Sequence, residues 1–492
     1  MSVLVLPILV PLSTAAVLML APIRPAPQRW ISLTGSVVLL ASALLVFVRV
    51  NATDVQVVHI SSWPAPFGIT LVADLLAAVL VVAVGVVGTA VSVVSFSGVD
   101  PRRETFGYHP LLHILLMGVA GAFLTGDFFN LYVWFEVMLV ASFVLMALNR
   151  TSAQMEAAFK YVTINLIASS IFLTALGLLY GATGTLNMAA LAREWPTIST
   201  PGVDTVLAVL FLIAFSIKAG LFPLFFWLPA SYHTPPAPIG AAFAGLLTKV
   251  GVYALIRVFT LLFHSAPPAL FALLLAMSAA TMVIGLVAAL NERDFRRVLS
   301  FNLVGHIAYT TASLSLLRPA ALAGAIFYLL HHIVVITNLY LVSGVLLRLR
   351  RTTDMAGLGG MYRDQPLFAA LAMIPIFSLA GVPPLSGFLG KLAILEGTFA
   401  AGAYGTGGVI LVVGLLTLLS MSRTWADSFW TPPAAPDLAT PSRPLLAAIA
   451  ALSLLTLAMT VGAEPLFAFT SRTAQQLLQR DGYVSAVLGA VH

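Results

Sequence analysis

The chain has 492 residues, of which 60% are hydrophobic and only 9% are charged, whereas soluble domains carry about 25% charged residues. This composition excludes an ordinary soluble enzyme and indicates a protein whose solvent is lipid. A net charge of +6 would suggest a nucleic-acid partner in a soluble protein, but here the position of the basic residues in loops explains the charge better. The absence of cysteine excludes disulfides and thiolate or iron–sulfur sites in this chain.

The apolar segments predict an all-α polytopic membrane protein with about fourteen transmembrane helices. The segments are long and rich in Leu, Val, Ala and Phe, whereas a membrane β-barrel would show short alternating segments. The first one lacks a basic flank and a cleavage site, so we expect a retained helix and not a signal peptide. The expected spans are 2–22, 29–49, 69–97, 109–126, 128–148, 159–180, 203–228, 238–263, 268–290, 297–316, 320–347, 366–400, 406–424 and 443–463.

Positive charge is concentrated in the loops that follow odd-numbered spans. The loops after even-numbered spans hold little beyond Arg49, Arg193 and Arg318. The positive-inside rule then predicts that the odd loops are cytoplasmic and that both termini face outward. The residues on the predicted inner side are Arg24, Arg29, Arg102, Arg103, Arg150, Lys160, Arg293, Arg296, Arg297, Arg348, Arg350, Arg351, Arg363, Arg423 and Arg443.

Two of the expected spans are interrupted by Gly and Pro. The seventh contains SIKAGLFPLFFWLP and the twelfth contains IFSLAGVPPLSGFLGKLAIL, and each holds one lysine. A helix can break at membrane depth only where it lines a cavity or is buried in protein. A pair of such spans, five apart in order, is typical of two structural repeats, although each alone could be an ordinary proline kink.

Three of the four lysines, Lys218, Lys249 and Lys391, fall within apolar spans. A charge at a helix centre costs about 2.5–3.5 kcal/mol on insertion scales, so each lysine needs a partner, a hydrated cavity or a function. Burial favours the neutral amine and a nearby carboxylate favours the ammonium. A lysine that gains and loses a nearby carboxylate can therefore bind and release a proton.

Glu136 is the acidic residue that lies well inside a span in the first half of the chain, so it is the natural counter-charge for one of these lysines. A structural ion pair that locks two helices is the alternative. Asp74 and Glu396 lie nearer to the ends of their spans, and we expect them to make interfacial or inter-subunit contacts.

Histidines add groups that exchange protons near neutral pH, because the unperturbed pKa of His is about 6.5. On the eleventh span His331 and His332 point about 100° apart, and Asn338 shares the face of His331, which makes His331 the stronger candidate. On the tenth span His306 belongs to a polar stripe that also holds Asn302, Tyr309, Thr310 and Ser313. Packing and interhelical hydrogen bonding are the alternatives for all of these residues.

The stretch KAGLFPLFFWLPASYHTPPAPIGAAFAGLLTKVGVYALIR, which begins at Lys218, resembles the signature of the antiporter-like membrane subunits shared by respiratory complex I and Mrp-type sodium/proton antiporters. The resemblance covers spans four to thirteen. Within that family, GATGTLNMAAL at 181–191 and HHIVVITNLYLVSG at 331–344 are most similar to the MrpD branch.

The short loops predict a single membrane domain over 1–492, and the resemblance implies two inverted repeats of five helices within it. The N-terminal helices would occupy 1–108, the repeats 109–263 and 268–424, the last span 443–463 and the tail 464–492. We assign the tail no function, although residues 470–492 could form a short surface helix.

The resemblance also implies a proton relay in which Glu136 is paired with Lys218, Lys249 connects to His331, and Lys391 ends the line. His306 and His332 are secondary candidates. Relatives often have a lysine on the eleventh span where this chain has Ile336, so the central connection would depend more on His331, His306 and water.

The implied function is proton movement coupled to sodium extrusion in a hetero-oligomeric complex with other membrane subunits. No cofactor is expected, since the sequence has neither a P-loop nor a dinucleotide fingerprint. Two alternatives stay open. One is a proton-pumping subunit of a complex I-like oxidoreductase or a membrane-bound hydrogenase, and the other is a scaffold whose buried charges only fix helix packing.

Overall fold

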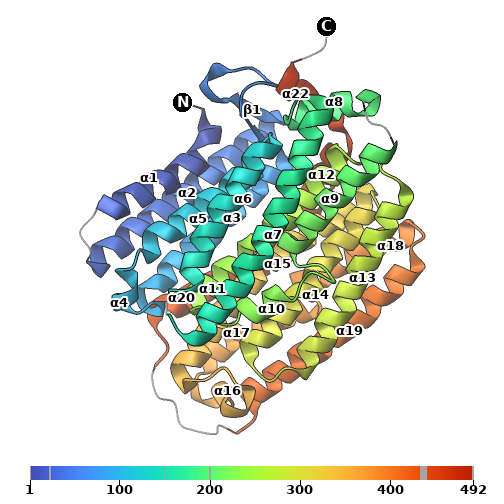
Figure 1. Ribbon diagram of the computed structural model, residues 1–492. Coiled ribbons are helices and arrows are strands. Elements are labelled where there is room, and N and C mark those ends of the chain that lie inside the picture. The colour runs from blue at the N-terminus through green and yellow to red at the C-terminus, as the bar shows by residue number, and fades with distance from the viewer. Residues whose placement is uncertain (1, 21–23, 149, 199–200, 433–439, 490–492) are drawn as a thin grey trace.

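The computed structural model describes residues 2–20, 24–148, 150–198, 201–432 and 440–489, and it is an almost entirely helical bundle (Figure 1). The membrane-length elements agree with the expected spans. They are α1 Leu6–Leu20, α2 Pro25–Thr53, α3 Leu75–Gly98, α5 Tyr108–Leu124, α6 Phe128–Met146, α7 Ser152–Thr183, α9 Pro201–Ala219, the continuous α11–η3–α12 Ala237–Leu261, α13 Pro268–Asn291, α14 Phe295–Ser315, α15 Pro319–Arg350, α17 Pro366–Ala380 with α18 Ser386–Ala400, α19 Tyr404–Trp425 and α20 Arg443–Val461.

Among the described residues, eleven helices are long and apolar enough to cross a membrane, and α5 and α17 are shorter apolar helices. The remaining span is α14, which begins close to Arg296 and Arg297. The prediction of an all-α membrane fold is therefore confirmed. Smaller helices fill the connections: α4 Pro101–Glu104, α8 Met188–Ile198, α10 Trp227–Ser231, α16 Met361–Asp364, α21 Ala463–Leu478 and α22 Arg480–Leu488.

The third span begins later than expected, because its first residues form a strand. β1 (Gln56–His59) and β2 (Thr70–Ala73) pair in antiparallel register, with Gln56 opposite Ala73. Asp74 then caps α3 by accepting a hydrogen bond from the Ala77 amide at 2.8 Å. The cap fixes the start of the helix at Leu75, so residues 69–74 belong to the hairpin.

Both predicted interruptions are present. α9 ends at Ala219 and is followed by Gly220 with φ +82°, and α17 ends at Ala380 and is followed by Gly381 with φ +87°. This left-handed conformation costs a residue with a Cβ about 1–2 kcal/mol, so glycine is the residue that ends a helix in this way. After each glycine a Pro-containing turn leads to the next helix, α10 or α18.

α15 forms the centre of the bundle (Figure 1). It packs against α14, α17, α18, α20, α21 and α11, and it is buried along nearly its whole length. A helix buried all round can carry polar side chains only if they are directed at other protein groups. The histidines of α15 are therefore held inside the protein and away from lipid.

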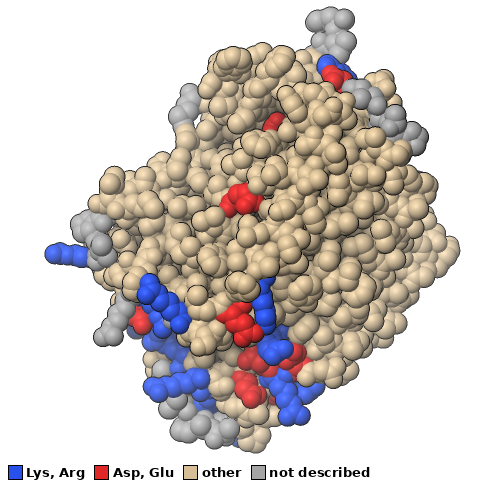
Figure 2. Space-filling view, viewed as in Figure 1, with Lys and Arg blue, Asp and Glu red and all other residues tan. Residues whose placement is uncertain are grey.

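The tail, where one short surface helix over 470–492 was expected, forms two helices, α21 and α22, and residues 490–492 lie outside the described part of the chain. α21 lies against α15, and Phe467 stacks on Phe327 with ring centroids 4.2 Å apart. The N-terminus and α22 lie at the same end of the bundle (Figure 1), while Lys and Arg gather at the opposite end (Figure 2).

Candidate functional site

Lys218 lies in the last turn of α9 and is buried, with 6% of its surface exposed. Its Nζ donates a hydrogen bond to Ser169 Oγ of α7 at 3.2 Å and lies 4.5 Å from the centre of the Phe135 ring. The C-terminal end of a helix carries a partial negative charge that stabilises a cation. The break after Ala219 thus creates a favourable place for an ammonium group inside the bundle.

Glu136 follows Phe135 on α6 and interacts electrostatically with Lys218. Within the described residues no hydrogen bond joins the two side chains, and Glu136 Oε1 is buried without any hydrogen-bond partner. A buried carboxylate oxygen without a partner costs free energy unless water completes its shell. Glu136 therefore follows the residue whose ring faces Lys218 Nζ, and no hydrogen bond holds it to the lysine.

A small cavity lies beside Lys218. Its volume is about 20 Å³, which is enough for about one water molecule. Tyr161, Asn165 and Tyr232 line it together with Leu247, which ends the π-helical segment η3 (Phe243–Leu247) just before Lys249. The cavity therefore reaches from Lys218 to the segment that directly precedes α12, the helix of Lys249.

Lys249 is completely buried at the start of α12, and its Nζ donates to the Ala244 carbonyl at 2.6 Å. The π-helical turn of η3 departs from the regular hydrogen-bond pattern, and such turns are frequent at functional sites. Two residues later Gly251 abuts the backbone of Lys218, because a Cβ there would lie 2.7 Å from the Lys218 carbonyl carbon. The two lysines are therefore carried by helices in direct backbone contact.

Between Lys249 and Lys391 lies a buried cluster of aromatic rings from α14 and α15. The ring centroids of His306 and His332 are 5.4 Å apart, and those of Tyr328 and His331 are 5.3 Å apart. His306 Nδ1 is hydrogen-bonded to the Tyr328 hydroxyl. The Nε2 atoms of all three histidines are buried without a hydrogen-bond partner among the residues described.

The two adjacent histidines have different neighbours. His331 is hydrogen-bonded through Nδ1 to Ser386 Oγ at 3.0 Å, whereas the ring of His332 lies beside that of His306. The expected connection from Lys249 to His331 stays a prediction. Asn338 does not support His331, since its amide donates to Ser453 of α20 at 2.9 Å.

Lys391 is buried in α18, and its Nζ donates to the carbonyls of Leu379 and Ala380 at 3.0 and 3.1 Å. These are last-turn carbonyls of α17, freed by the break. Lys391 Nζ also lies 5.8 Å from the centre of the Tyr309 ring. Lys391 Nζ thus lies at the C-terminal end of one interrupted helix, as Lys218 lies in the last turn of the other.

Among the residues that surround these lysines and histidines, Tyr328, Ser386 and the cavity-lining Tyr232 were not predicted from the sequence. Tyr328 precedes His331 by three residues and so shares its face, a signal that could have identified it. Ser386 and Tyr232 follow the Pro-containing turns, where the chain path cannot be inferred from helical periodicity. Tyr309 was expected only as part of a polar stripe, and its ring lies 5.1 Å from that of Tyr328.

The expectation for Asp74 is wrong. Its carboxylate forms an ion pair with Arg257 of α12 at 2.6 Å, and both side chains are almost fully buried in this chain. Arg257 also lies over the rings of Tyr253 and Tyr483, so the tail covers the pair. Glu396, in contrast, is exposed on α18, on a different face from Lys391, as expected from their spacing.

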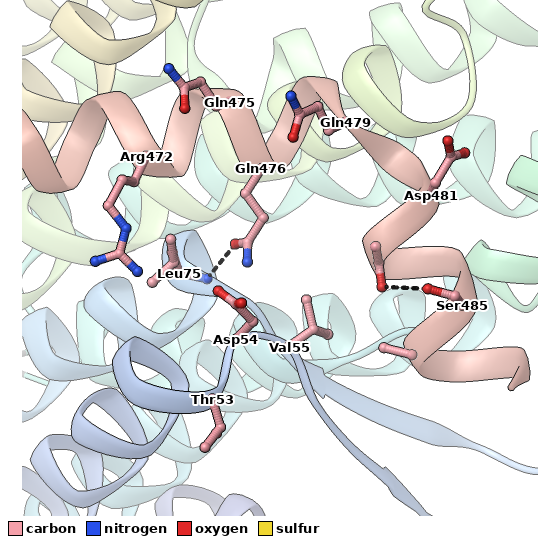
Figure 3. Close-up of a pocket in the computed structure, with 12 residues that line it drawn as sticks. Thr53, Asp54, Val55, Leu75, Arg472, Gln475, Gln476, Gln479, Asp481 and Ser485 are labelled. Atoms are coloured by element: carbon pink, nitrogen blue, oxygen red, sulfur yellow. Dashed lines mark hydrogen bonds between the residues drawn. The ribbon is translucent and has the colours of Figure 1, made fainter. Parts of the chain in front are cut away.

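A separate groove of about 790 Å³ lies between the tail and the ends of α2 and α3 (Figure 3). Gln476 spans it and accepts a hydrogen bond from the Leu75 amide at 2.9 Å. None of the lysines or histidines above lines this groove. Among the described residues, no three His, Asp or Glu side chains are grouped to hold a metal ion.

Comparisons with known proteins all match one family of membrane proteins. The family model of the NADH:quinone oxidoreductase/Mrp antiporter transmembrane proteins matches residues 125–420, more than half of the chain. The chain is 40% identical to the D subunit of the Na(+)/H(+) antiporter of Alkalihalophilus pseudofirmus, over 98% of this chain and 99% of that protein. The corresponding D subunit of Bacillus subtilis is 37% identical over 98% of this chain and 99% of that protein.

Solved structures agree with the sequence matches. A chain of the Mrp complex from Dietzia sp. superimposes with a TM-score of 0.92 at 30% identity, covering 99% of both chains. A chain of a membrane-bound sulfane sulfur reductase, an archaeal respiratory membrane complex, gives the same TM-score at 27% identity, covering 99% of this chain and 100% of that one. The chain therefore belongs to the NADH:quinone oxidoreductase/Mrp antiporter membrane family, and within it to the D subunits of Na(+)/H(+) antiporters.

Proposed function

We propose that this chain carries protons through the membrane along Glu136, Lys218, Lys249, the His306–His331–His332 cluster and Lys391, as one subunit of a sodium/proton antiporter. The observation that supports this most is the placement of two lysines at the C-terminal ends of two interrupted helices, with a third lysine and three histidines buried between them. The five-helix repeats at 109–263 and 268–424 are part of the same proposal.

The groups of the row have partners that suit proton exchange. Lys391 and Lys249 have carbonyl acceptors for the ammonium form, whereas the unpartnered ring nitrogens of the histidines can accept a proton. Water in the cavity beside Lys218 would supply the missing step between Glu136, Lys218 and the η3 segment. A charge that enters at one lysine disfavours a second positive charge nearby, so protons would move in sequence along the row.

The antiporter role is favoured over a redox-driven pump by the relatives. The chain is 40% identical to the D subunit of an antiporter over nearly its full length. Among the solved structures, the identity is 30% to the chain of the Mrp complex and 27% to the chain of the respiratory complex. The partner proteins decide between the two functions. Co-purification with other antiporter subunits supports the proposal, and co-purification with iron–sulfur proteins contradicts it.

We further propose that the arginine-rich end faces the cytoplasm and that both termini face outward, in a bacterial or archaeal cell membrane. The gathering of Lys and Arg at one end of the bundle supports this orientation (Figure 2). The complex would contain further membrane subunits and would transport protons and sodium ions. This chain would need no cofactor.

The relay is tested by measuring sodium-dependent pH collapse in everted vesicles that contain the whole complex. We expect Lys218→Ala and Lys391→Ala to reduce exchange to the level of vesicles that lack the complex. The matched control is Lys160→Ala, because Lys160 is the one lysine outside the row and is exposed beside Glu156.

The amount of assembled complex is quantified for each variant. Undiminished exchange in Lys218→Ala or Lys391→Ala would contradict the relay. A loss of exchange that matches a loss of assembled complex would show instead that the buried lysines only hold the helices together.

A further inference from the structure

A second cavity, of about 350 Å³, opens at the arginine-rich end of the bundle, far along the helices from the aromatic cluster. Its walls come from the end of α3, α4, the loop before α11 and the start of that helix, the start of α14, the end of α15 and the start of α20. Arg103, Arg296 and Arg348 line it, with Asp100 as the one carboxylate among the lining residues. None of the relay residues takes part, so the cavity needs an explanation of its own.

Arg296 is the feature that distinguishes this cavity from an ordinary basic surface. Only 6% of the residue is exposed. Its Nε donates to Ser343 Oγ at 3.0 Å and its Nη1 donates to the Pro235 carbonyl at 3.1 Å, whereas Nη2 is buried with no hydrogen-bond partner in the described structure. The side chain is thus fixed on two sides and leaves one donor unsatisfied.

No carboxylate pairs directly with this guanidinium in the part of the chain that the structure describes. Asp294 acts on it electrostatically, but the Asp294 carboxylate accepts hydrogen bonds from the backbone amides of Arg296 and Arg297 and from the Thr353 hydroxyl. A buried cation without a paired anion is costly, so a bound anion would complete the site. The positive-inside rule alone would place arginines on the surface and would not require a buried one.

The rest of the cavity is divided between charge and apolar surface. Arg103 and Arg348 add two further guanidinium groups, and Asp100 is 3.9 Å from Arg103 at the rim. The opposite lining includes Val94, Leu347 and Leu445. A ligand that fits this surface has an anionic head and an apolar body.

We propose that this cavity binds the phosphate of an anionic phospholipid headgroup, with Arg296 at its base and Arg103 and Arg348 at its rim. Guanidinium groups match phosphate oxygens with paired N–H donors. Basic pockets between the ends of membrane helices are suited to anionic lipids. Free inorganic phosphate shares the head chemistry but lacks the acyl chains that the apolar wall would cover, so the lipid is the occupant that the site favours.

The test uses the whole complex, purified and stripped of lipid in a neutral detergent. Phosphatidylglycerol, phosphatidylcholine and inorganic phosphate are titrated separately, and bound molecules are counted by native mass spectrometry. We expect phosphatidylglycerol to bind more tightly than phosphatidylcholine. The double variant Arg103→Gln/Arg348→Gln should weaken its binding roughly tenfold or more, as expected for the loss of two cations near an anionic headgroup.

Arg363→Gln is the matched control, because Arg363 is an exposed arginine outside the cavity lining; its affinity should equal that of the unmodified complex. Arg296→Gln is informative only if the complex assembles, and the rim variants make the test independent of it. Phosphatidylglycerol binding that is equal in the double variant and the control would overturn the proposal. Binding of inorganic phosphate with no preference for phosphatidylglycerol would overturn the lipid assignment.

Discussion

Tyr232 is fully buried, and its hydroxyl has no hydrogen-bond partner among the described residues. It lines the same cavity as Lys218. A buried hydroxyl that makes no hydrogen bond costs about 1–3 kcal/mol, which a single water in the cavity would remove. Tyr232 is thus well placed to hold the water that links Lys218 to the segment before Lys249.

Tyr232→Phe keeps the ring and removes only this hydroxyl. We expect sodium-dependent exchange per assembled complex to fall roughly 2- to 10-fold, as one hydrogen bond of about 0.5–1.5 kcal/mol would give. Exchange is measured in everted vesicles. Tyr108→Phe is the control, since the Tyr108 hydroxyl is equally buried but is bonded to Ser95 at 2.7 Å, away from the cavity. Equal exchange in both variants would exclude a role for the Tyr232 hydroxyl.

At the scale of single residues, the sequence predicts that the lysines within apolar spans are buried, but it predicts neither the burial of Arg257 and Arg296 nor which charges meet. Lys218, Lys249 and Lys391 stand out because a lysine in an apolar span needs a reason. Helical spacing also shows that His331 and His332 face different directions. It cannot show what surrounds each histidine, because that depends on how α14, α17 and α18 pack around α15.

The two interrupted helices end in the same backbone conformation but have different surroundings. Gly220 and Gly381 both adopt a positive φ. A Cβ at Gly220 would meet Leu228 Cδ1 at 3.0 Å, whereas a Cβ at Gly381 would meet the Lys391 side chain at 3.1 Å. One break is therefore packed against an apolar side chain, and the other is packed against a proposed relay group.

Gly220→Ala and Gly381→Ala should each destabilise the complex by about 1–2 kcal/mol, because each forces a residue with a Cβ into a left-handed conformation. We expect only Gly381→Ala to lower sodium-dependent exchange per assembled complex as well. Thermal unfolding and vesicle exchange are measured on the same preparations. Gly177→Ala is the control, because Gly177 lies within α7 with nothing within 4 Å of its Cβ position. Equal exchange per complex in the two break variants would separate Gly381 from the relay.

At the scale of elements, apolar length predicts the spans and the Gly–Pro pattern predicts both breaks. The π-helical segment η3 has no comparable signal, since FAGLL is as apolar as its neighbours. The hairpin of β1 and β2 was missed because Thr70–Ala73 is apolar and directly precedes α3. In both cases tertiary packing decides a conformation that local composition leaves open.

At the scale of the whole molecule, contacts between distant parts of the sequence close both ends of the bundle. At one end, Asp74, Arg257 and Tyr483 come from the beginning, the middle and the tail of the chain. No spacing rule relates these positions, which is why Asp74 was expected at an interface. The tail therefore belongs to the fold, and it covers a charge pair that would be costly to leave unpaired.

At the arginine-rich end, Glu104 of α4 accepts hydrogen bonds from Arg29 Nε at 2.9 and 3.1 Å and lies 3.8 Å from the His109 ring. Burial would raise the pKa of the Glu104 carboxyl, but the His109 ring and the Arg29 guanidinium together hold this pKa below its ordinary value of 4.5. A carboxylate whose pKa is lowered by folding contributes stability above its unfolded pKa, and that contribution is lost as the pH falls through the folded value.

Glu104→Gln should therefore lower the stability of the complex by about 1.5–3 kcal/mol at neutral pH, the range for a hydrogen bond to a charged group. The difference from the unmodified complex should shrink as the pH falls below about 4.5, because the native carboxyl then takes up a proton. The thermal midpoint of the purified complex is measured from pH 7 downward. Glu156→Gln serves as the control, since Glu156 pairs with Lys160 on the exposed surface, where ion pairs contribute little. The thermal midpoints of Glu104→Gln and the unmodified complex could instead differ by the same amount across this pH range. That result would show that Glu104 stabilises this end of the bundle through its shape and not through its charge.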